Sequence, residues 1–241
     1  MIFNNLYRTS PKFVHASGRP EFLPLWETIK AIRPIFHSSC PSNLTIVTYN
    51  NGPTGYNGKT NGLFEQSLER AGIQNFVVLG NGIKKWMNKL KIQLLQSFLP
   101  QITTKYVLSS DSSDVLLVRP LNGITEDFDK FNCQMLFNAE KNIWPTDLPA
   151  DIVKFERDRT ASIFPFLNAG LWIARTEFLL QHLHELNDYK FETKHTMSEQ
   201  IYYKYFYLNY SADIRVDCEC KLFQNINRVE KDIIQINETY Y

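Results

Sequence analysis

Short apolar runs rich in β-branched and aromatic residues alternate along this chain with segments of helical periodicity. The runs predict strands at 44–49, 76–79, 106–108, 115–118 and 135–140. Between them, apolar residues at three- and four-residue spacing predict a helix over 63–71, capped by Gly72, and another over 87–98, ended by Pro100. The stripe expected to face the core in this second helix consists of Met87, Leu90, Leu94 and Phe98. Alternation of strands and helices is typical of a mostly parallel sheet with helices on both faces.

The first 43 residues lack this alternation. Five prolines interrupt them and leave room for one helix, from about Leu25 to Ile32, with Trp26, Ile29 and Ile32 on one face. We therefore expect residues 1–43 to form an arm packed on a main domain of residues 44–241, and the sequence assigns no function to the arm.

The composition is that of one globular domain and excludes several classes of protein. The chain has 241 residues, 44% of them hydrophobic, which is enough for a sizeable core. Its 26 basic and 25 acidic residues give a net charge of +1, so neither a nucleic-acid surface nor a disordered chain is indicated. The four cysteines, at positions 40, 133, 218 and 220, are too scattered for a disulfide framework and are expected to be free thiols.

Two further sequence patterns indicate where in the cell the protein is expected. No segment has the run of about eighteen apolar residues that a membrane-spanning helix needs, so no integral membrane segment is expected. Residues 1–5 are not followed by the basic and apolar regions of a secretory signal peptide. The expected location is therefore the cytoplasm.

An acidic pair, Asp111 and Asp114, follows the strand at 106–108 in a run of serines. Ligands of such sheets bind beyond the carboxyl ends of the strands, so chemistry is expected at this place. Two carboxylates on one tight turn can hold a hard divalent cation and bridging phosphates. The structural alternative is that Asp111 caps a turn and Asp114 faces solvent.

A second candidate segment ends the strand at 135–140. Glu140 and the nearby Trp144 offer an acid to a sugar hydroxyl and a flat face to a sugar ring. The structural alternative makes Glu140 a surface residue and Trp144 a plug of the core.

Two more segments combine polar and apolar residues. In 166–173, Asn168 and the small residues Ala169 and Gly170 interrupt an apolar run, which indicates either close backbone approach to a ligand or a bulge. Glu199 and Gln200 stand at the first turn of an aromatic-rich helix, where a glutamate also serves the helix dipole.

Taken in order, these segments resemble the glycosyltransferase domain of the procollagen-lysine dioxygenase (lysyl hydroxylase) and collagen glycosyltransferase-like family, which is of the GT-A class. The resemblance covers about Leu44 to Asn227. Its matching pieces are 106–115, 136–140, Trp144-Pro145, 166–170, 198–203, Asp217 and 222–225. It implies a GT-A type, Rossmann-like α/β fold with a mixed, mostly parallel sheet flanked by helices.

By this resemblance the protein transfers a hexose from a UDP-sugar to a hydroxyl acceptor, which is a glycan, a lipid-linked sugar or a protein side chain. Asp111 and Asp114 form the DxxD motif that binds Mn²⁺, with Mg²⁺ as the alternative. The metal and a lysine stabilise the departing diphosphate. The implied catalytic residues are Glu199, which activates or orients the acceptor, with Asn168 and Gln200.

The resemblance also implies a nucleotide-sugar site. Thr48 and Tyr49 would lie beside the uracil, and Lys91 matches the family lysine, with Lys89 as a rival. The full implied set is Thr48, Tyr49, Lys91, Asp111, Ser113, Glu140, Trp144, Asn168 and Gly170.

Three features depart from the family pattern. Ser113 stands where a tyrosine often precedes the second aspartate, and Ser198 and Glu199 replace two aspartates. The family's third metal ligand, a histidine in a His-Gly-Asn-Gly segment after the last strands, has no match. The five histidines all precede that position, and none fits it: His15, His37, His182, His184 and His195.

The missing ligand leaves a second hypothesis, a non-catalytic nucleotide-sugar-binding domain. A third, a Mg²⁺-dependent phosphohydrolase built on Asp111 and Asp114, lacks the downstream lysine and aspartate that such an enzyme uses.

Overall fold

The structure is a computed structural model, and it describes residues 2–18, 25–31, 36–52, 61–191 and 194–236. The strands are β1 (Ile2–Asn4), β2 (Phe13–His15), β3 (Leu44–Tyr49), β4 (Val77–Leu79), β5 (Tyr106–Asp111), β6 (Val115–Leu117), β7 (Met135–Glu140), β8 (Phe166–Arg175), β9 (Ile214–Val216), β10 (Phe223–Asn225) and β11 (Ile234–Ile236). The helices are α1 (Trp26–Ala31), α2 (Leu63–Arg70), α3 (Leu90–Phe98), α4 (Ile124–Asp129), α5 (Ala150–Asp158), α6 (Thr176–His182) and α7 (Glu199–Asn209), with 3₁₀ turns at Leu99–Gln101 and Leu183–Asn187.

The largest sheet has six strands in the order β4-β3-β5-β8-β7-β9, and β8 runs antiparallel to both of its neighbours. The other pairs in this sheet are parallel. Tyr49 pairs with Asp111, and Glu140 pairs with Phe166, so the carboxyl ends of β3, β5 and β7 share one edge with the start of β8. The expected mixed, mostly parallel sheet is confirmed.

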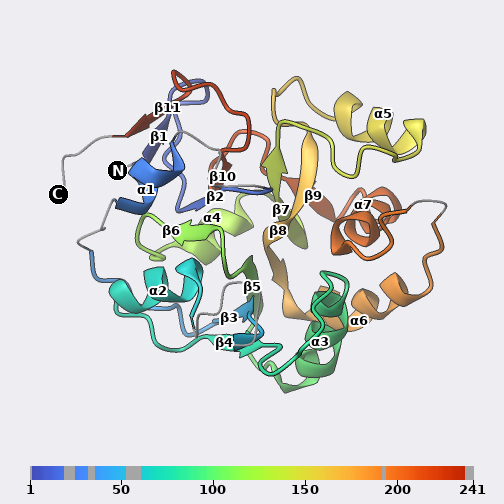
Figure 1. Cartoon of the computed structure of the whole chain (residues 1–241), viewed down its shortest axis with the longest axis horizontal. Coiled ribbons are helices and arrows are strands. Elements are labelled where there is room, and N and C mark those ends of the chain that lie inside the picture. Colours follow the sequence, from blue (N-terminus) through green and yellow to red (C-terminus); the bar gives the residue numbers. More distant parts are fainter. Residues whose placement is uncertain (1, 19–24, 32–35, 53–60, 192–193, 237–241) are drawn as a thin grey trace.

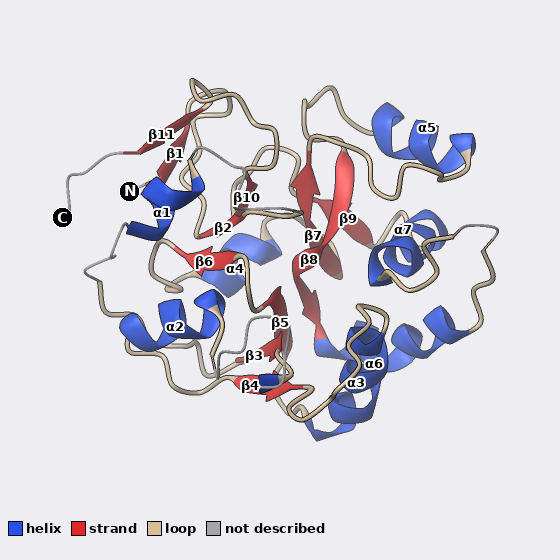
Figure 2. Cartoon of the chain, in the orientation of Figure 1, coloured by secondary structure: helices blue, strands red, loops and turns tan. Residues whose placement is uncertain are grey.

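Helices cover both faces of this sheet (Figures 1 and 2). Successive residues of a strand point to opposite faces, so Val107 of β5 joins the apolar cluster under α3, α5, α6 and α7, whereas Leu108 joins the cluster under α2 and α4. Each face of the sheet thus has its own core. The two cores hold the strand ends, and the side chains that follow them, in fixed positions.

The first 43 residues contribute strands to two small sheets. β2 lies between β10 and β6, and β1 pairs with β11, beside which it lies in Figure 1. His15, at the end of β2, pairs with Val115 on β6 and with Asn225 on β10. The next residue, Ala16, donates its backbone N–H to the carbonyl of Asp114 at 2.8 Å. The arm is therefore tied to the turn that carries the acidic pair.

The stripe expected on the second helix is correct only in part. Leu94 and Phe98 are partly buried and pack against the core, but Met87 is 39% exposed and lies before α3. The buried side chains of α3 are Lys91, Ile92 and Leu95. Ile92, Leu95 and Leu99 also have helical spacing, so the sequence contains two overlapping stripes. The ion pairs of Lys91 described below favour the rotation that is observed.

Other expectations of the sequence hold. Trp26 and Ile29 of α1 are buried, while Ile32 lies outside the described residues. Gly72 follows α2 with a φ of 84°, as a helix-ending glycine requires. All four cysteines are free thiols.

Candidate functional site

A cavity of about 980 Å³ opens where β3, β5 and β7 end. It is rich in carboxylates, which arrive from β5, β7, the turn before β6 and the start of α7. The predicted site residues that line it are Tyr49, Lys91, Asp111, Ser113, Asp114, Glu140, Trp144, Asn168, Gly170, Glu199 and Gln200. The structure thus gathers at one place side chains that are up to about 150 residues apart in the sequence, as the carboxyl-end rule for such sheets predicts.

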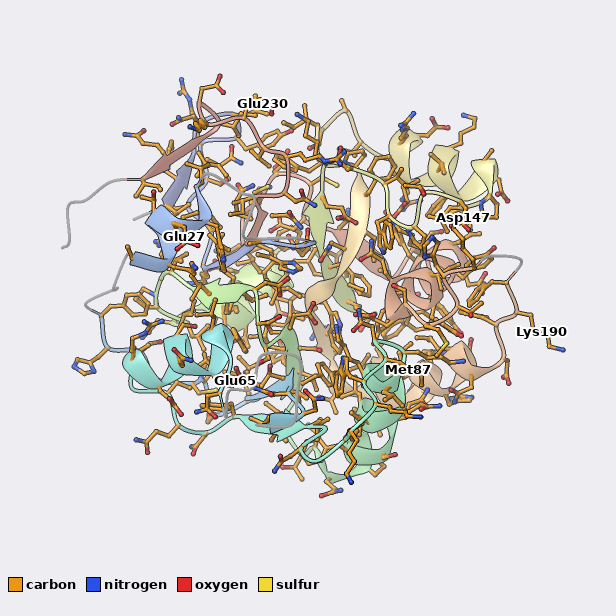
Figure 3. All side chains as sticks on the ribbon, in the orientation of Figure 1. Glu27, Glu65, Met87, Asp147, Lys190 and Glu230 are labelled. Carbon is orange, nitrogen blue, oxygen red and sulfur yellow. The ribbon has the colours of Figure 1, made fainter. Side chains whose placement is uncertain are left out.

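The turn that carries Asp111 and Asp114 is anchored to α2. Ser112, between them, donates its hydroxyl to Glu65 Oε2 at 2.7 Å and accepts a hydrogen bond from Asn50 Nδ2 at 3.1 Å. The carbonyl of Ser112 accepts the backbone N–H of Phe64 at 2.9 Å. Glu65, labelled on α2 in Figure 3, is fully buried, and burial raises the pKa of its carboxyl. These bonds fix the direction in which the acidic pair points.

His15 completes this acidic pair from β2. Its Nε2 lies 3.5 Å from Asp114 Oδ2 and 4.0 Å from Asp111 Oδ2. One ligand atom from each of the three residues lies within 4.8 Å of the other two. Burial by itself lowers the pKa of His15, but the carboxylates of Asp114 and Asp111 raise it above its usual value. None of the five histidines fits the family's C-terminal position, but the fold brings His15 beside the acidic pair, where the three residues could hold a metal ion.

Several buried polar atoms in and around this triad have no hydrogen-bond partner among the described residues. They include His15 Nε2, Asp114 Oδ1 and Glu199 Oε2. Leaving such atoms unsatisfied costs about 1–3 kcal/mol each. An imidazole nitrogen with carboxylate oxygens is a donor set suited to Mn²⁺, and carboxylate oxygens alone suit Mg²⁺. The residues present thus fit a divalent cation.

Lys91 bridges two of the carboxylates. Its Nζ contacts Asp111 Oδ1 and lies 2.6 Å from Glu199 Oε1. Burial lowers the pKa of Lys91, but the two carboxylates raise it above the ordinary lysine range, so the ammonium form is held. The rival, Lys89, instead places its Nζ 4.7 Å from the ring of Tyr202. Of the two lysines, Lys91 is the one that lines the cavity.

Glu140 is the centre of a second network in the cavity wall. It accepts a hydrogen bond from Gln200 Nε2 at 2.6 Å and another from Asn168 Nδ2 at 3.3 Å. Burial raises the pKa of Glu140 to about 7, although Lys204 and these hydrogen bonds oppose the rise. A carboxyl that titrates near neutral pH can exchange a proton with a bound hydroxyl.

Both polar atoms of the Gln200 amide are bonded to the protein. Its Nε2 also donates to the carbonyl of Trp144 at 2.9 Å, and its Oε1 accepts the backbone N–H of Ala169 at 3.2 Å. These bonds hold β7, β8 and the segment at Trp144 together, and the catalytic role expected for Gln200 stays a prediction.

Trp144 forms an aromatic wall of the cavity. It is 45% exposed, and its ring centroid lies 4.8 Å from that of His195. His195 Nε2 lies 3.5 Å from Asp147 Oδ1, and Asp147 is labelled in Figure 3. A large exposed ring beside polar groups suits a sugar face, as the sequence predicts, and does not plug the core.

Residues 45–239 match the family model described as the PLOD GT domain. The chain belongs to the PLOD GT domain family. The resemblance seen in the sequence is thereby confirmed.

A curated relative of this PLOD GT domain is the procollagen-lysine,2-oxoglutarate 5-dioxygenase of Drosophila melanogaster. It is 25% identical over 162 residues, which are 64% of this chain and 21% of the fly protein. The chain therefore spans about a fifth of that relative.

Two solved structures are also similar in fold. A glycosyltransferase involved in the glycosylation of the major capsid of PBCV-1 is 16% identical with a TM-score of 0.47, over 72% of this chain and 80% of that one. A 4-diphosphocytidyl-2C-methyl-D-erythritol synthase from Anaerococcus prevotii is 10% identical with a TM-score of 0.40, over 80% of this chain and 91% of that one.

One predicted site residue of this PLOD GT domain faces away from the cavity. The side chain of Thr48 is fully buried and donates its hydroxyl to Glu65 Oε1 at 3.3 Å. It therefore helps to anchor the acidic turn and is not exposed toward a uracil. Tyr49, the next residue, lines the cavity and accepts a hydrogen bond from Ser109 Oγ at 3.1 Å.

Several residues that line the cavity of the PLOD GT domain were missed by sequence reasoning, and three of them carry a ring or a charge. His15 lies in a three-residue strand, Trp86 lies in a loop, and Arg228 follows β10, and all three line the cavity. A weak signal existed for His15, since the apolar pair Phe13-Val14 precedes it in a short strand-like run.

No helix in the part of the chain that the structure describes is both long and apolar enough to cross a membrane.

Proposed function

We propose that this chain is a metal-dependent glycosyltransferase that transfers a hexose from a UDP-sugar to a hydroxyl acceptor. The observation that carries the proposal is the cluster of His15, Asp111 and Asp114 inside the large cavity. These three residues would hold a divalent cation, with Mn²⁺ as the first choice and Mg²⁺ as the second. Such a cation, when bound, acts as a Lewis acid that neutralises charge on a departing nucleoside diphosphate.

The residues of the cavity would bind and orient the donor. Lys91 holds Asp111 in place and adds a fixed positive charge where charge develops on the leaving group. Tyr49 would lie beside the uracil, and Asn168, whose amide is bonded to Glu140 Oε2 and to the backbone N–H of Gly170, would line the sugar pocket. Trp144 offers an exposed face to a sugar ring of the donor or of the acceptor.

The acceptor hydroxyl must lose a proton as its oxygen bonds to C1 of the sugar and the bond from C1 to UDP breaks. Glu199 is one candidate base, because its Oε2 is buried without a partner among the described residues. Glu140 is the other, because its pKa of about 7 lies near the operating pH. A positioned base contributes roughly 10²–10⁴-fold to the rate.

The hypothesis of a non-catalytic nucleotide-sugar-binding domain rests on the lack of a third metal ligand. His15 would supply such a ligand, so we favour the enzyme. The acceptor is proposed only by class, as a hydroxyl of a glycan, a lipid-linked sugar or a protein side chain.

The first test is thermal unfolding of the full chain with UDP, UDP-glucose or UDP-galactose, each with and without Mn²⁺. A ligand at a hundred times its dissociation constant adds about 2.7 kcal/mol to the free energy of unfolding. The expected result is a shift that needs both UDP and Mn²⁺, that is lost in Asp114→Asn, and that survives in Asp188→Asn, which alters an exposed aspartate.

Slow release of UDP from the preferred UDP-sugar without acceptor would then support catalysis over mere binding. A Mn²⁺-dependent shift without any turnover would favour the non-catalytic domain. The absence of a shift with every nucleotide would overturn both hypotheses.

A further inference from the structure

The two nitrogens of the His15 ring face different neighbours. Nε2 points toward Asp114 Oδ2 at 3.5 Å, on the side of the acidic pair. Nδ1 lies 3.1 Å from Nδ2 of Asn138 in β7. His15 is 1% exposed and Asn138 is 0% exposed, so water does not compete for either contact. The ring is therefore held by an amide on one side and by carboxylates on the other.

A register shift in the main sheet creates this arrangement. Phe137 pairs with Trp172 of β8, whereas Asn138 pairs with Asn168, so the three residues from 169 to 171 have no counterpart on β7. Such bulges re-aim the side chains beside them. Within the bulge, a methyl group added at Gly170 would lie 2.4 Å from His15 Cε1. The ring is thus packed against Gly170 as well as bonded to Asn138.

The chemistry of imidazole sets a condition on any metal at this place. A neutral ring carries one proton, so a ring that gives its Nε2 lone pair to a cation carries the proton on Nδ1. That Nδ1–H needs a hydrogen-bond acceptor, and such an acceptor fixes both the tautomer and the ring orientation.

Asn138 can supply the acceptor without moving its backbone. Its Oδ1 is buried and has no partner among the described residues, while its Nδ2 faces His15 Nδ1. The oxygen and nitrogen of an amide are nearly identical in size, and a half-turn of the amide group exchanges them. After that half-turn Oδ1 accepts the Nδ1–H, and Nε2 presents its lone pair to the acidic pair.

We infer that Asn138 is a positioning residue for the cation site, and that its side-chain oxygen holds His15 in the tautomer that binds metal through Nε2. The inference rests on the proposed function, since it concerns the cation that His15, Asp111 and Asp114 would hold. Asn138 does not itself touch the metal or the substrate in this scheme.

The test measures Mn²⁺ binding to the full chain without nucleotide, by calorimetry or by electron paramagnetic resonance of free Mn²⁺. Asn138→Leu keeps the approximate size but removes the acceptor, and it should weaken Mn²⁺ binding about 10- to 100-fold. Asn138→Asp provides a carboxylate oxygen for the Nδ1–H and should restore the affinity at least to the wild-type level.

The matched control is Asn4→Leu. Asn4 is also 0% exposed and donates to Gln224 Oε1 at 2.7 Å, but it does not line the cavity. This variant loses a buried asparagine and its hydrogen bond, so it reports what general destabilisation does. Its Mn²⁺ affinity should equal that of the wild type.

Because the charge added in Asn138→Asp attracts a cation by itself, the ring tautomer is the second readout. The ¹⁵N chemical shifts of His15, measured with diamagnetic Mg²⁺ bound, should show the proton on Nδ1 in the wild type and in Asn138→Asp. A proton on Nε2 would overturn the inference. Should Asn138→Leu fail to fold, this measurement on the wild type still tests the inference.

The outcomes separate this inference from the proposed function. Failure of the folded wild type to bind Mn²⁺ would overturn the metal site itself. Binding by the wild type and by Asn138→Leu with equal affinity would overturn only the role of Asn138. Equal losses in Asn138→Leu, Asn138→Asp and Asn4→Leu would make that role merely structural and would also overturn the inference.

Discussion

The ammonium group of Lys204 lies 2.7 Å from Glu156 Oε2 and 2.8 Å from Oε1, and the two side chains are 0% and 1% exposed. The pair joins α7 to α5. Glu156 Oε1 also accepts the backbone N–H of Leu167 at 2.8 Å, one residue before Asn168 of the cavity. One buried ion pair thus connects two helices with the strand that carries part of the site.

Lys204→Met should lower the free energy of unfolding by about 3–5 kcal/mol. The reason is that Glu156 would keep a buried charge without its partner. Urea denaturation measures this loss. Lys154→Met is the control, because Lys154 pairs with Asp158 on the exposed side of α5 and its removal should cost less than about 1 kcal/mol. Similar losses in the two variants would contradict the role given to the buried pair.

Gly170→Ala should weaken Mn²⁺ binding. Its methyl group would lie 2.4 Å from His15 Cε1 and 2.6 Å from Asp111 Oδ2, so two of the three candidate ligands would have to move. We expect a loss of affinity of more than about tenfold, since a displaced ligand removes at least one charge-assisted contact. Calorimetry with Mn²⁺ alone measures it.

The control for this substitution is Gly123→Ala. Gly123 has a φ of 71°, and no atom lies within 4 Å of an added methyl group, so the change strains the backbone by roughly 1–2 kcal/mol without crowding any residue. Its Mn²⁺ affinity should be unchanged. If Gly170→Ala bound Mn²⁺ as Gly123→Ala does, the triad would not be the metal site.

The main sheet and most of the site were predictable from the sequence because both depend on local patterns. Buried parallel strands appear as short apolar runs, and the residue that ends each run lies at the ligand-binding edge. Asp111 and Glu140 were found in this way, and both line the cavity. Asn168 was found because a polar residue interrupts an apolar run at the bulge that the structure places there.

His15 could not be found by such reasoning. Its strand has three residues, and the parallel partner of that strand, β10, lies about two hundred residues further along the chain. A strand so short gives almost no periodic signal, and its position depends on non-local pairing. The rotation of α3 was missed for a related reason, since the ion pairs of Lys91 depend on tertiary structure.

The stability of the wild type should fall as pH rises from about 4.5 to about 7, in part because of Glu140. Its folded-state pKa is raised by burial to about 7 from an ordinary 4.5, so ionisation is penalised only in the folded protein. The contribution is complete below the unfolded pKa and is lost as pH passes the folded pKa. Glu140→Gln should reduce this fall by on the order of 3 kcal/mol, measured by urea denaturation from pH 4.5 to 8.

Two other carboxyl groups serve as controls for the pH dependence expected of Glu140. Glu177→Gln removes an exposed carboxyl from α6 and should leave the pH dependence as it is in the wild type. Asp217, whose pKa burial raises to about 6, adds a separate fall at lower pH that Glu140→Gln leaves in place. A pH dependence of stability identical in Glu140→Gln and the wild type would show that the carboxyl of Glu140 is not held in a desolvated state.

Arg228→Ala should weaken binding of UDP about tenfold at low salt and by less at high salt. Arg228 lines the cavity, is exposed, and has no ion-pair partner among the described residues, whereas the charge of Lys91 is already engaged by two carboxylates. A hydrogen bond to a charged phosphate contributes about 1.5–3 kcal/mol, and salt screens it.

Arg8→Ala is the matched control, because Arg8 is also exposed, has a φ of 54° against 55° for Arg228, and lies outside the cavity. Calorimetric titration with UDP in the presence of Mn²⁺, at two salt concentrations, measures the affinities of the two variants. Equal affinities would place the diphosphate away from Arg228.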